Sequence, residues 1–498
     1  MAKKGLSSRV SGQALESPPT RPFHSFHPDL PPNTIWGFDG IYPGPTFHAR
    51  YGEPILVRHF NDLPQDHRGF GIPQVSTHLH NGHTPSESDG FPSDFYPSIV
   101  GGPERFHDHH YPNALAGFSY QPPGDLREAL STLFYHDHRV DFTAQNVYKG
   151  LAGFYLLFNE WDSGDETIGF RLPSGMFDVP MMFADKLFDQ DGQLFFDLFG
   201  LDGLLGDKFT VNGKIQPFLQ VHPRRYRFRW LNVGPSRFNR FFLTDLHNLE
   251  RVIPFTQISS DGNLLPRSIA VTDVIMGSAE RTDVIVDFSQ FAPGTSIYLE
   301  NRLEQVDGRA GTGRFFEPGQ GNLALRFDVV LPRVRDESLP PPYTFYEVPR
   351  PTPAELAKAR VRTFLFDRMN GQWSINGRFF DGETIRAAPI EETGEIWILE
   401  NQPPRQPGAR SWAHPIHIHL EEFQVLSRDG RPPPVVEQGR KDVVRLGITS
   451  QVRVFLRFRD FLGRYPMHCH NILHEDHAMM LRWDVVSRKR EGRDPVRR

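Results

Sequence analysis

The chain has 498 residues, 55 Lys and Arg against 60 Asp and Glu, a net charge of −5 and a sequence pI of 6.5. This slightly acidic balance argues against nucleic acid or an anionic membrane surface as a partner. No segment approaches the ~18 consecutive apolar residues of a membrane span, and a single cysteine excludes an intrachain disulfide.

The N-terminal stretch MAKKGLSSRVSGQALESPPT carries basic residues but no apolar core. A secretory signal needs an apolar segment of about 7–15 residues after its basic start. We therefore do not expect this stretch to act as an export signal.

A turn followed by an alternating strand occurs three times along the chain. The three stretches end at Asn61, Asn232 and Asn401, which lie about one domain length apart. In the second stretch, residues 226–231 alternate aromatic or aliphatic side chains with arginines. Alternation with a period of two is typical of a half-buried strand. The repeat predicts three similar β-sandwich domains.

We place these domains at residues 1–165, 166–345 and 346–498. The Pro-rich run at 337–353, ESLPPPYTFYEVPRPTP, reads as the linker between the second and third. Helical periodicity is scarce, and the clearest helix is TPAELAKAR, which Thr352 and Pro353 open well.

Four His-x-His pairs stand out among the 22 histidines. Residues i and i+2 of a strand face the same side, so each pair presents two imidazoles to one place. The first and third domains carry two pairs each at matching offsets, whereas the second has only His247 at the corresponding place. This pattern predicts a polynuclear metal site between domains one and three, with domain two as a spacer. The pairs are His78 with His80, His136 with His138, His417 with His419, and His468 with His470.

The last pair encloses Cys469, the single thiol of the chain. Together with His474, Met479 and the out-of-phase His414, it supplies two imidazoles, a thiolate and a thioether. That set is typical of blue copper, whereas a structural zinc site uses four strong ligands and no thioether. Met480 is the alternative axial residue. If Cys469 faces one side of its strand, His468 and His470 face the other.

These motifs resemble those of the three-domain multicopper oxidases, specifically the bilirubin oxidase and spore-coat laccase group. The resemblance covers nearly the whole chain and rests on THLHNGHTPSESDGFP, FYHDHRVDFTAQNVYKGLAGFY, WAHPIHIHLEEFQVLSR, KDVVRLG and HCHNILHEDHAMM. It implies an all-β fold of three cupredoxin-like Greek-key β-sandwich domains. It also implies four copper ions and a laccase-like copper oxidoreductase with O₂ as acceptor.

Residue by residue, the resemblance implies a copper ligand at each position of the clusters. The type 2 ligands would be His78 and His417. The type 3 ligands would be His80, His136, His138, His419, His468 and His470. The type 1 ligands would be His414, Cys469, His474 and Met479. Four one-electron substrate oxidations at type 1 would then be coupled to four-electron reduction of O₂ to water at the trinuclear cluster.

Two acids match the family's proton-supplying carboxylates, namely Glu475 and Asp89. The alternative for each is an ordinary loop carboxylate. Electrons are expected to enter at His474, because the family's substrates dock beside that ligand. Trp412 either contacts the substrate there or only packs.

The resemblance leaves the substrate open among phenols, aminophenols, aromatic amines and tetrapyrroles such as bilirubin. A metal-ion oxidase acting on Cu(I), Fe(II) or Mn(II) is the alternative, although the nine methionines are scattered rather than gathered in a Met-rich insert. A non-catalytic copper-binding protein is disfavoured by the complete ligand set.

Other histidines lie near the clusters but outside the ligand spacing. They are His83, His477 and the loop histidines His107, His109 and His110. The expected partners are O₂ and a small aromatic reductant, with the chain as a monomer. Three locations stay open: the cytoplasm, the spore coat or cell surface, and export with a leader since removed.

Overall fold

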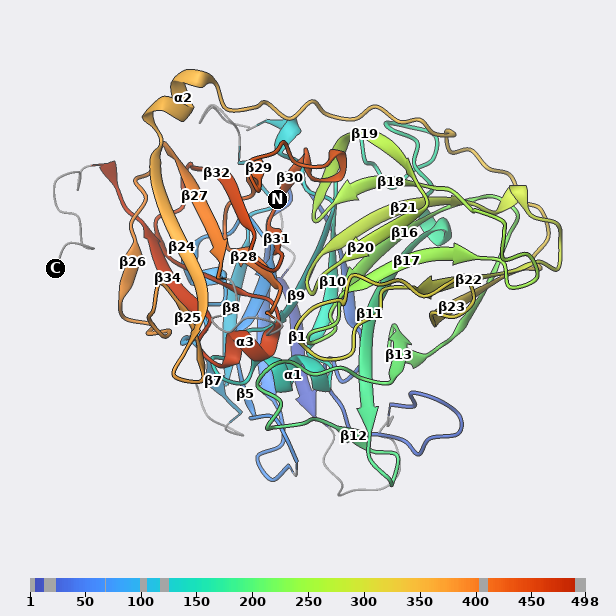
Figure 1. Cartoon of the computed structure of the whole chain (residues 1–498), viewed down its shortest axis with the longest axis horizontal. Helices are drawn as coiled ribbons and strands as arrows, with labels where there is room; N and C mark the ends of the chain where they lie inside the picture. The colour runs from blue at the N-terminus through green and yellow to red at the C-terminus, as the bar shows by residue number, and fades with distance from the viewer. Residues whose placement is uncertain are drawn as a thin grey trace.

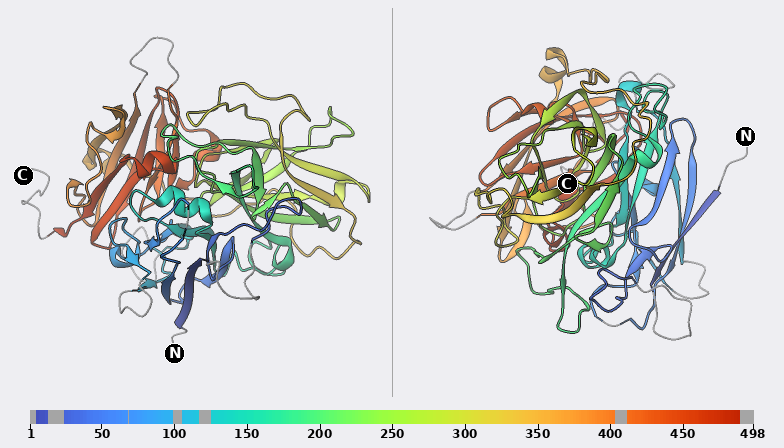
Figure 2. Two further views of the ribbon diagram at one scale, coloured as in Figure 1. Left: turned by 90° about the horizontal axis from the view of Figure 1, so that it is seen from below. Right: turned by 90° about the vertical axis from the view of Figure 1, so that its right-hand side faces the viewer.

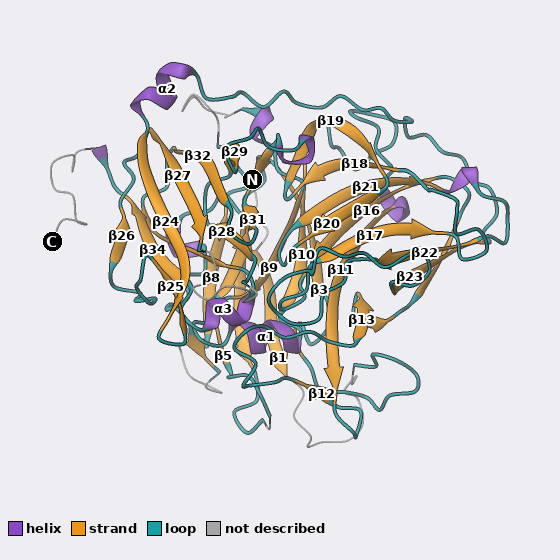
Figure 3. Cartoon of the chain, in the orientation of Figure 1, coloured by secondary structure: helices purple, strands orange, loops and turns teal. Residues whose placement is uncertain are grey.

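The computed structural model describes residues 5–12, 24–67, 69–98, 105–116, 125–402 and 411–488. Strands make up most of the ordered structure and the helices are short (Figure 3). The three α-helices of the described residues are α1 (Thr143–Lys149), α2 (Pro353–Lys358) and α3 (Ile472–Asp476). This composition confirms the predicted all-β class.

The N-terminal third forms two four-stranded sheets, one with strand order β2-β1-β4-β8 and one with β3-β10-β9-β6. A small sheet, β5-β7, lies beside them. The bounds are β1 (Gly5–Gly12), β2 (Trp36–Phe38), β3 (Gly44–Arg50), β4 (Ile55–Asp62), β5 (Gln74–Val75), β6 (Thr77–His80), β7 (Tyr96–Pro97), β8 (Phe106–Tyr111), β9 (Thr132–Asp137) and β10 (Ala152–Phe158).

The middle third also forms two sheets, ordered β14-β13-β11-β16-β21-β18-β19, with β12 on β11, and β15-β23-β22-β17-β20. The bounds are β11 (Asp178–Phe188), β12 (Leu194–Phe195), β13 (Lys208–Val211), β14 (Lys214–Ile215), β15 (Phe218–Val221), β16 (Arg225–Asn232), β17 (Asn239–Thr244), β18 (Phe255–Ser260), β19 (Asn263–Val271), β20 (Asp273–Met276), β21 (Arg281–Asp287), β22 (Ser296–Asn301) and β23 (Asn322–Val329).

The last third repeats the plan with sheets β25-β24-β27-β32-β29-β30 and β26-β34-β33-β28-β31. The bounds are β24 (Arg360–Met369), β25 (Gln372–Ile375), β26 (Ile385–Ala387), β27 (Thr393–Asn401), β28 (His414–Ile418), β29 (Phe423–Arg428), β30 (Arg440–Lys441), β31 (Val443–Leu446), β32 (Gln451–Phe458), β33 (Gly463–Cys469) and β34 (Met480–Val485). The orange and red strands of this part stand beside the blue ones of the first and face the green ones of the second (Figure 1).

The three repeated stretches form β4, β16 and β27, as predicted. The expectation that residues 226–231 form a half-buried strand is wrong, because β16 is buried on both faces. Arg227 and Arg229 are 1% and 0% exposed. Arg227 pairs with Asp162 at 2.8 Å, and Arg229 with Asp178 at 2.7 Å. The arginine face therefore packs against the first third of the chain, and paired carboxylates offset the cost of burying its charge.

The Pro-rich run crosses the outside of the molecule from β23 to α2 (Figure 1). Its middle is docked, because Tyr343 and Phe345 are buried in a small cluster with Ile258 and Leu264. Helix α2 begins as predicted: the Thr352 side chain accepts the Glu355 N–H and the Glu355 carboxylate accepts the Thr352 N–H. This reciprocal capping satisfies two backbone donors at the helix start.

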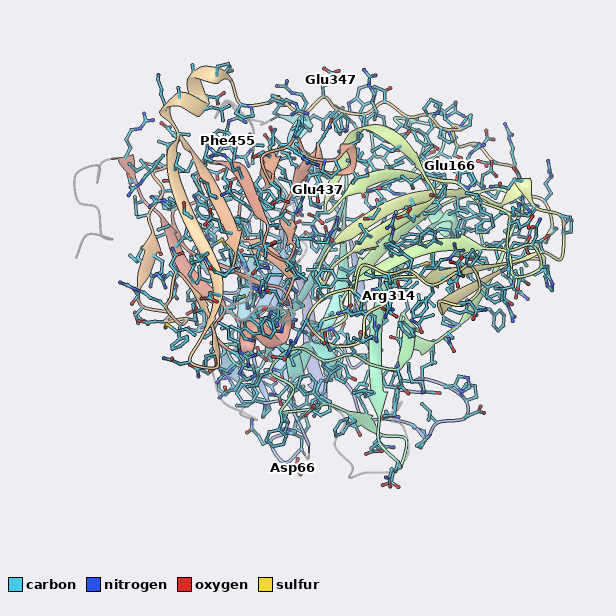
Figure 4. All side chains as sticks on the ribbon, in the orientation of Figure 1. Asp66, Glu166, Arg314, Glu347, Glu437 and Phe455 are labelled. Atoms are coloured by element: carbon cyan, nitrogen blue, oxygen red, sulfur yellow. The ribbon has the colours of Figure 1, made fainter. Side chains whose placement is uncertain are left out.

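Ion pairs join the last third to the middle one. Glu437 lies where the orange and green parts meet (Figure 4). It pairs with Arg428 at 2.9 Å and with Arg445 at 3.6 Å. The Arg445 guanidinium donates across the boundary to the Ile275 carbonyl at 2.8 Å and also pairs with Glu280.

Helices α1 and α3 lie side by side where the first and last thirds meet (Figures 1 and 2). The Ala144 N–H in α1 donates to the Asp476 carboxylate in α3 at 3.0 Å. Each helix follows a strand that ends in a His-x-His pair, β9 and β33 respectively. Among the described residues, no helix has the length and apolar character needed to cross a membrane.

Candidate metal centres

The four His-x-His pairs lie on two equivalent pairs of strands. Strand β6 runs antiparallel to β9 with His78 opposite His136, and β28 runs antiparallel to β33 with His417 opposite His468. Because alternate residues share a face, each strand pair presents its histidines to one side. All eight side chains are at least 96% buried. The structure therefore brings the predicted clusters of the first and third parts together in one buried site.

Imidazole nitrogens face one another at the centre of this site. His138 Nε2 lies 3.2 Å from His419 Nε2 and 3.1 Å from His468 Nε2. Buried ring nitrogens of His78, His136, His417 and His470 have no hydrogen-bond partner. Leaving such groups unpaired costs free energy, and the part of the protein that the structure describes supplies no hydrogen-bond partner that would offset this cost. It fits metal ions that take imidazole ligands.

Backbone carbonyls fix the orientation of several rings. His78 Nδ1 donates to the Asp89 carbonyl at 2.5 Å, and His417 Nδ1 donates to the Asp442 carbonyl at 2.9 Å. His136 Nδ1 donates to the Asp137 carbonyl at 2.8 Å. A ring that donates from Nδ1 leaves the Nε2 lone pair available for a metal.

Three buried carboxylates surround the histidines. Asp89 Oδ2 lies 2.8 Å from His419 Nδ1. Glu475 lies 3.2 Å from His138 Nδ1 and 3.0 Å from His468 Nδ1. Both acids selected from the sequence thus contact the cluster.

The third carboxylate, Asp442, was missed by the sequence reasoning. Its Oδ2 lies 2.7 Å from His80 Nε2. One sequence signal could have found it: an acid stands directly before the apolar Val443-Val444, where a buried charge needs a partner.

Burial sets the charge of the site. It lowers the pKa of His136 to about 4 and that of His78 well below its ordinary value, and neighbouring histidines lower the latter further. Burial also raises the pKa of Asp89 well above the usual range. His136 and His78 are therefore neutral near pH 7, which is the form that binds a metal.

A second, smaller centre lies on the other face of β28 and β33. Cys469 Sγ is 3.4 Å from His414 Nδ1 and 3.6 Å from His474 Nδ1, and these two nitrogens are 3.1 Å apart. Burial lowers the pKa of His414 to about 3 and raises that of the Cys469 thiol well above its usual value. The thiolate therefore needs a cation beside it, so this donor set also fits a metal.

Met479 and Met480 are both buried, but they face different surroundings. Met479 packs in the same core cluster as Cys469. Its N–H donates to the His474 carbonyl at 2.9 Å, and its carbonyl accepts the Cys469 N–H at 3.1 Å. Met480 stands opposite His468 in the β33–β34 register, on the face that carries the eight histidines.

His474, the expected point of electron entry, is fully buried. Trp373 lies against it with ring centroids 3.9 Å apart, and Trp412 meets Trp373 edge-on at 4.9 Å. The Asp202 carbonyl lies 3.2 Å from His474 Nε2 and covers the ring from the middle third of the chain. Trp412 is partly exposed, so the Trp412–Trp373 contact is one route from the surface to His474.

The histidines expected in a loop, His107, His109 and His110, instead lie on strand β8, and two of them contact the turn before Asp89. His107 Nε2 donates to the Glu87 carbonyl at 3.0 Å, and His109 Nδ1 donates to the Ser88 carbonyl at 3.2 Å. Both carbonyls belong to the 3₁₀ turn η1 (Ser86–Ser88), which directly precedes Asp89. His83 pairs with Asp460 at 2.9 Å, and His477 ends α3.

Comparison with known proteins agrees with this geometry. Residues 352–489 match the multicopper oxidase family. Bilirubin oxidase of Albifimbria verrucaria is 33% identical over 474 residues, covering 94% of this chain and 75% of that protein. Laccase of Bacillus subtilis is 31% identical over 517 residues, covering 93% and 92% respectively. These relatives favour the predicted oxidase over the metal-ion alternative.

Solved structures show the same fold. The multicopper oxidase of Pediococcus acidilactici superposes with a TM-score of 0.77 at 23% identity, covering 97% of this chain and 88% of that one. The McoA multicopper oxidase of Aquifex aeolicus gives 0.76 at 24% identity, covering 97% and 96%. The predicted cupredoxin-like β-sandwich architecture is confirmed. The chain belongs to the multicopper oxidases, four-copper oxidoreductases that use O₂ as the electron acceptor.

Proposed function

We propose that the reducing substrate is a small aromatic molecule, namely a phenol, an aminophenol or a tetrapyrrole. The observation that carries this proposal is the pair of tryptophans, in edge-on contact, that links the partly exposed Trp412 to the buried His474. An aromatic substrate can pack against Trp412, whose partner Trp373 lies 3.9 Å from the His474 ring. Laccase and bilirubin oxidase are also the names of the relatives described above.

Charged residues surround this candidate docking point. The Arg309 and Arg368 guanidinium carbons lie 4.7 Å and 5.4 Å from the Trp412 ring centre. Both pair with the Asp202 carboxylate, at 3.0 Å and 2.6 Å. Arginine over an indole face holds the ring in place through cation–π attraction. The ring that would receive the substrate is therefore in contact with two arginines.

We assign the copper ligands as the family resemblance implies, and the donor geometry supports the assignment. The three type 1 donors on one face of β28 and β33 are separate from the eight histidines on the other. The type 1 ligands are His414, Cys469, His474 and Met479. The type 2 ligands are His78 and His417. The type 3 ligands are His80, His136, His138, His419, His468 and His470.

The preference for Met479 as axial ligand rests on packing. Met479 shares a core cluster with Cys469, whereas Met480 lies opposite His468. The chain direction at Met479 is fixed by its two backbone hydrogen bonds to Cys469 and His474. A side chain held in this way can approach the thiolate without further rearrangement.

When bound, copper supplies four one-electron substrate oxidations at the type 1 site and four-electron reduction of O₂ to water at the trinuclear cluster. The protein joins the two sites covalently, because Cys469 lies between His468 and His470 in the chain. Its side chain points to the small centre and theirs point to the large one. Burial of both sites excludes bulk water.

We assign proton supply to Glu475 and Asp89. Glu475 touches one cluster histidine from each domain, His138 and His468. Asp89 touches His419 with its carboxylate and His78 with its carbonyl. A carboxyl group next to the site where O₂ is reduced can transfer a proton over one short step.

The chain organisation is proposed as predicted: domains at 1–165, 166–345 and 346–498, in a monomer. The strands pair into sheets within 5–158, 178–329 and 360–485, which supports these boundaries. Size-exclusion chromatography with light scattering tests the monomer.

Oxygen consumption by the copper-loaded protein tests the substrate class. We expect fast uptake with a dimethoxyphenol, an aminophenol or bilirubin, and slow uptake with Fe(II) or Cu(I). Trp412→Ala should raise KM for the aromatic substrates. Trp161→Ala is the matched control, because Trp161 is 46% exposed and belongs to neither centre. Uptake with Fe(II) or Cu(I) alone would contradict the proposal.

A further inference from the structure

The middle domain supplies none of the proposed ligands. It nevertheless contacts residues 441–443, a segment of the third domain that borders the histidine cluster. The Asp261 carboxylate accepts the backbone N–H groups of Asp442 at 3.2 Å and Val443 at 3.1 Å. It also pairs with Lys441 Nζ at 3.0 Å. Asp261 stands in the turn between β18 and β19. The segment before β31 is therefore held from the middle domain.

Arg281, the first residue of β21, binds the side chain of Asp442 in the same segment. Its Nη2 lies 2.9 Å from Asp442 Oδ1, and its Nη1 lies 3.1 Å from Asp442 Oδ2. This two-point contact sets the plane of the carboxylate as well as its position. Arg281 is itself fixed, because it donates to the Ala279 carbonyl at 2.9 Å and to the Thr132 carbonyl at 3.3 Å.

Asp442, held in this way, contacts one histidine from each of the two domains that supply ligands. Its Oδ2 lies 2.7 Å from His80 Nε2, and its carbonyl accepts His417 Nδ1 at 2.9 Å. Neither ring nitrogen of His80 has a hydrogen bond of good geometry, but Nε2 lies against the Asp442 carboxylate, which leaves Nδ1 as the nitrogen that His80 can offer the cluster. His417 likewise offers only Nε2. The nitrogen that each ring presents is thus decided by Asp442.

Asp89 makes the mirror-image contacts, with its carbonyl on His78 and its carboxylate on His419. Among the described residues, Asp89 forms no ion pair with a lysine or arginine. The two halves of the cluster are therefore held by similar aspartates, and an arginine of the middle domain fixes one of them.

We propose that Arg281 is a positioning residue for the trinuclear site: through Asp442 it fixes which nitrogens of His80 and His417 face the coppers. The inference rests on the proposed assignment of these two histidines as ligands. It gives the spacer domain a direct part in assembling the cluster. Loss of partners that orient metal ligands weakens metal binding roughly ten- to a hundred-fold.

The test compares Arg281→Met with Arg227→Met in the full-length, copper-loaded protein. Arg227 is equally buried in the same domain and pairs with Asp162 and Asp283, but touches no cluster residue. We expect Arg281→Met to keep the blue type 1 absorption and to lose the type 2 electron paramagnetic resonance signal. Its cluster coppers should yield to a chelator at roughly ten- to a hundred-fold lower concentration. Arg227→Met should lose stability but keep all four coppers.

Arg281→Met leaves Asp442 buried without its cation, which can prevent folding. Two further variants address this. Arg281→Lys keeps the charge but loses the two-point contact, and we expect an intermediate loss of cluster copper. Arg281→Met/Asp442→Asn removes both charges, so it should fold but still bind cluster copper weakly.

Recovery of full cluster copper in the double variant would mean that Arg281 only compensates charge, and would overturn the proposal. A wild-type type 2 signal that persists unchanged in Arg281→Met overturns it as well. Absence of that signal from the wild-type protein would instead contradict the ligand assignment itself.

Discussion

The first and third domains build the same strand pair and use it differently. In each domain, the residue between the two histidines of the second pair points away from the cluster. This residue is Asp137 in the first domain and Cys469 in the third. The backbone is equivalent, since the His138 N–H donates to the Ser76 carbonyl and the His470 N–H to the Pro415 carbonyl. These contacts align Ser76 with Pro415 and His138 with His470. In the first domain, Val75 therefore occupies the position of His414, and Phe142 occupies that of His474.

Asp137 has a structural task at its position. Its carboxylate accepts the Ser76 N–H at 2.8 Å and the Asn146 amide at 2.9 Å, which ties β9 to the start of β6 and to α1. Cys469 instead lies within 3.6 Å of two imidazoles. A few side chains on one strand face thus give the third domain a second, Cys469-containing centre that the first domain lacks, while the histidine face is shared. Four predictions test this difference.

The largest effect is expected from the thiol. Cys469→Ser should be colourless and without oxidase activity above background, because a hydroxyl does not replace the thiolate of a blue copper site. Asp137→Ser, at the matching position, should stay blue and active. Absorption spectra and oxygen uptake of both copper-loaded proteins measure this. A blue Cys469→Ser protein would refute the type 1 assignment.

The next effect concerns the residue that follows each pair at equal spacing, which is the acid Glu475 in the third domain and the neutral Thr143 in the first. Glu475→Gln should slow reoxidation of the reduced enzyme by O₂ about a hundred-fold, since it removes a proton donor, and the blue colour should remain. Rapid mixing with O₂ measures the rate. Asp476→Asn is the control, because Asp476 contacts α1 rather than a cluster histidine. An unchanged rate in Glu475→Gln would rule out the proton role.

A smaller effect is expected on stability. Asp137→Ala leaves the buried Ser76 N–H without its acceptor, which costs about 1–3 kcal/mol for an unsatisfied group, whereas the Asn146 amide keeps its bonds to the Ile72 and Gln74 carbonyls. The protein should stay blue and unfold at lower denaturant concentration. Chemical unfolding followed by fluorescence measures the change. Loss of the blue colour at native conditions would show that Asp137 affects the type 1 site and that the two faces are not independent.

The smallest effect separates the two methionines. Met479→Leu should keep the blue colour and raise the type 1 reduction potential, because removing a weak thioether donor destabilises the oxidised ion. Met480→Leu should leave the potential unchanged. Redox titration of the blue band compares them. The opposite result would make Met480 the axial residue.

The sequence alone predicted the strands that carry the histidines, because His-x-His spacing has the period of a strand. The matching offsets of these pairs also showed that the first and third domains carry equivalent sets. It also gave the separation of Cys469 from its neighbours, because adjacent side chains of a strand point to opposite faces. The strands ending at Asn61, Asn232 and Asn401 followed from local alternation. Each of these features is short in range, so a local pattern determines it.

Other features were decided by the tertiary structure. The sequence pattern of β16 predicts that its arginine face is exposed. Arg227 and Arg229 are buried because the first domain packs against that face. Asp442 was one acid among many until the fold placed it between Arg281 and His80, residues from two other domains. The burial of His474 beneath Trp373 and Asp202 has the same origin. These contacts join distant parts of the chain, so no local period or spacing encodes them, and domain packing alone determines them.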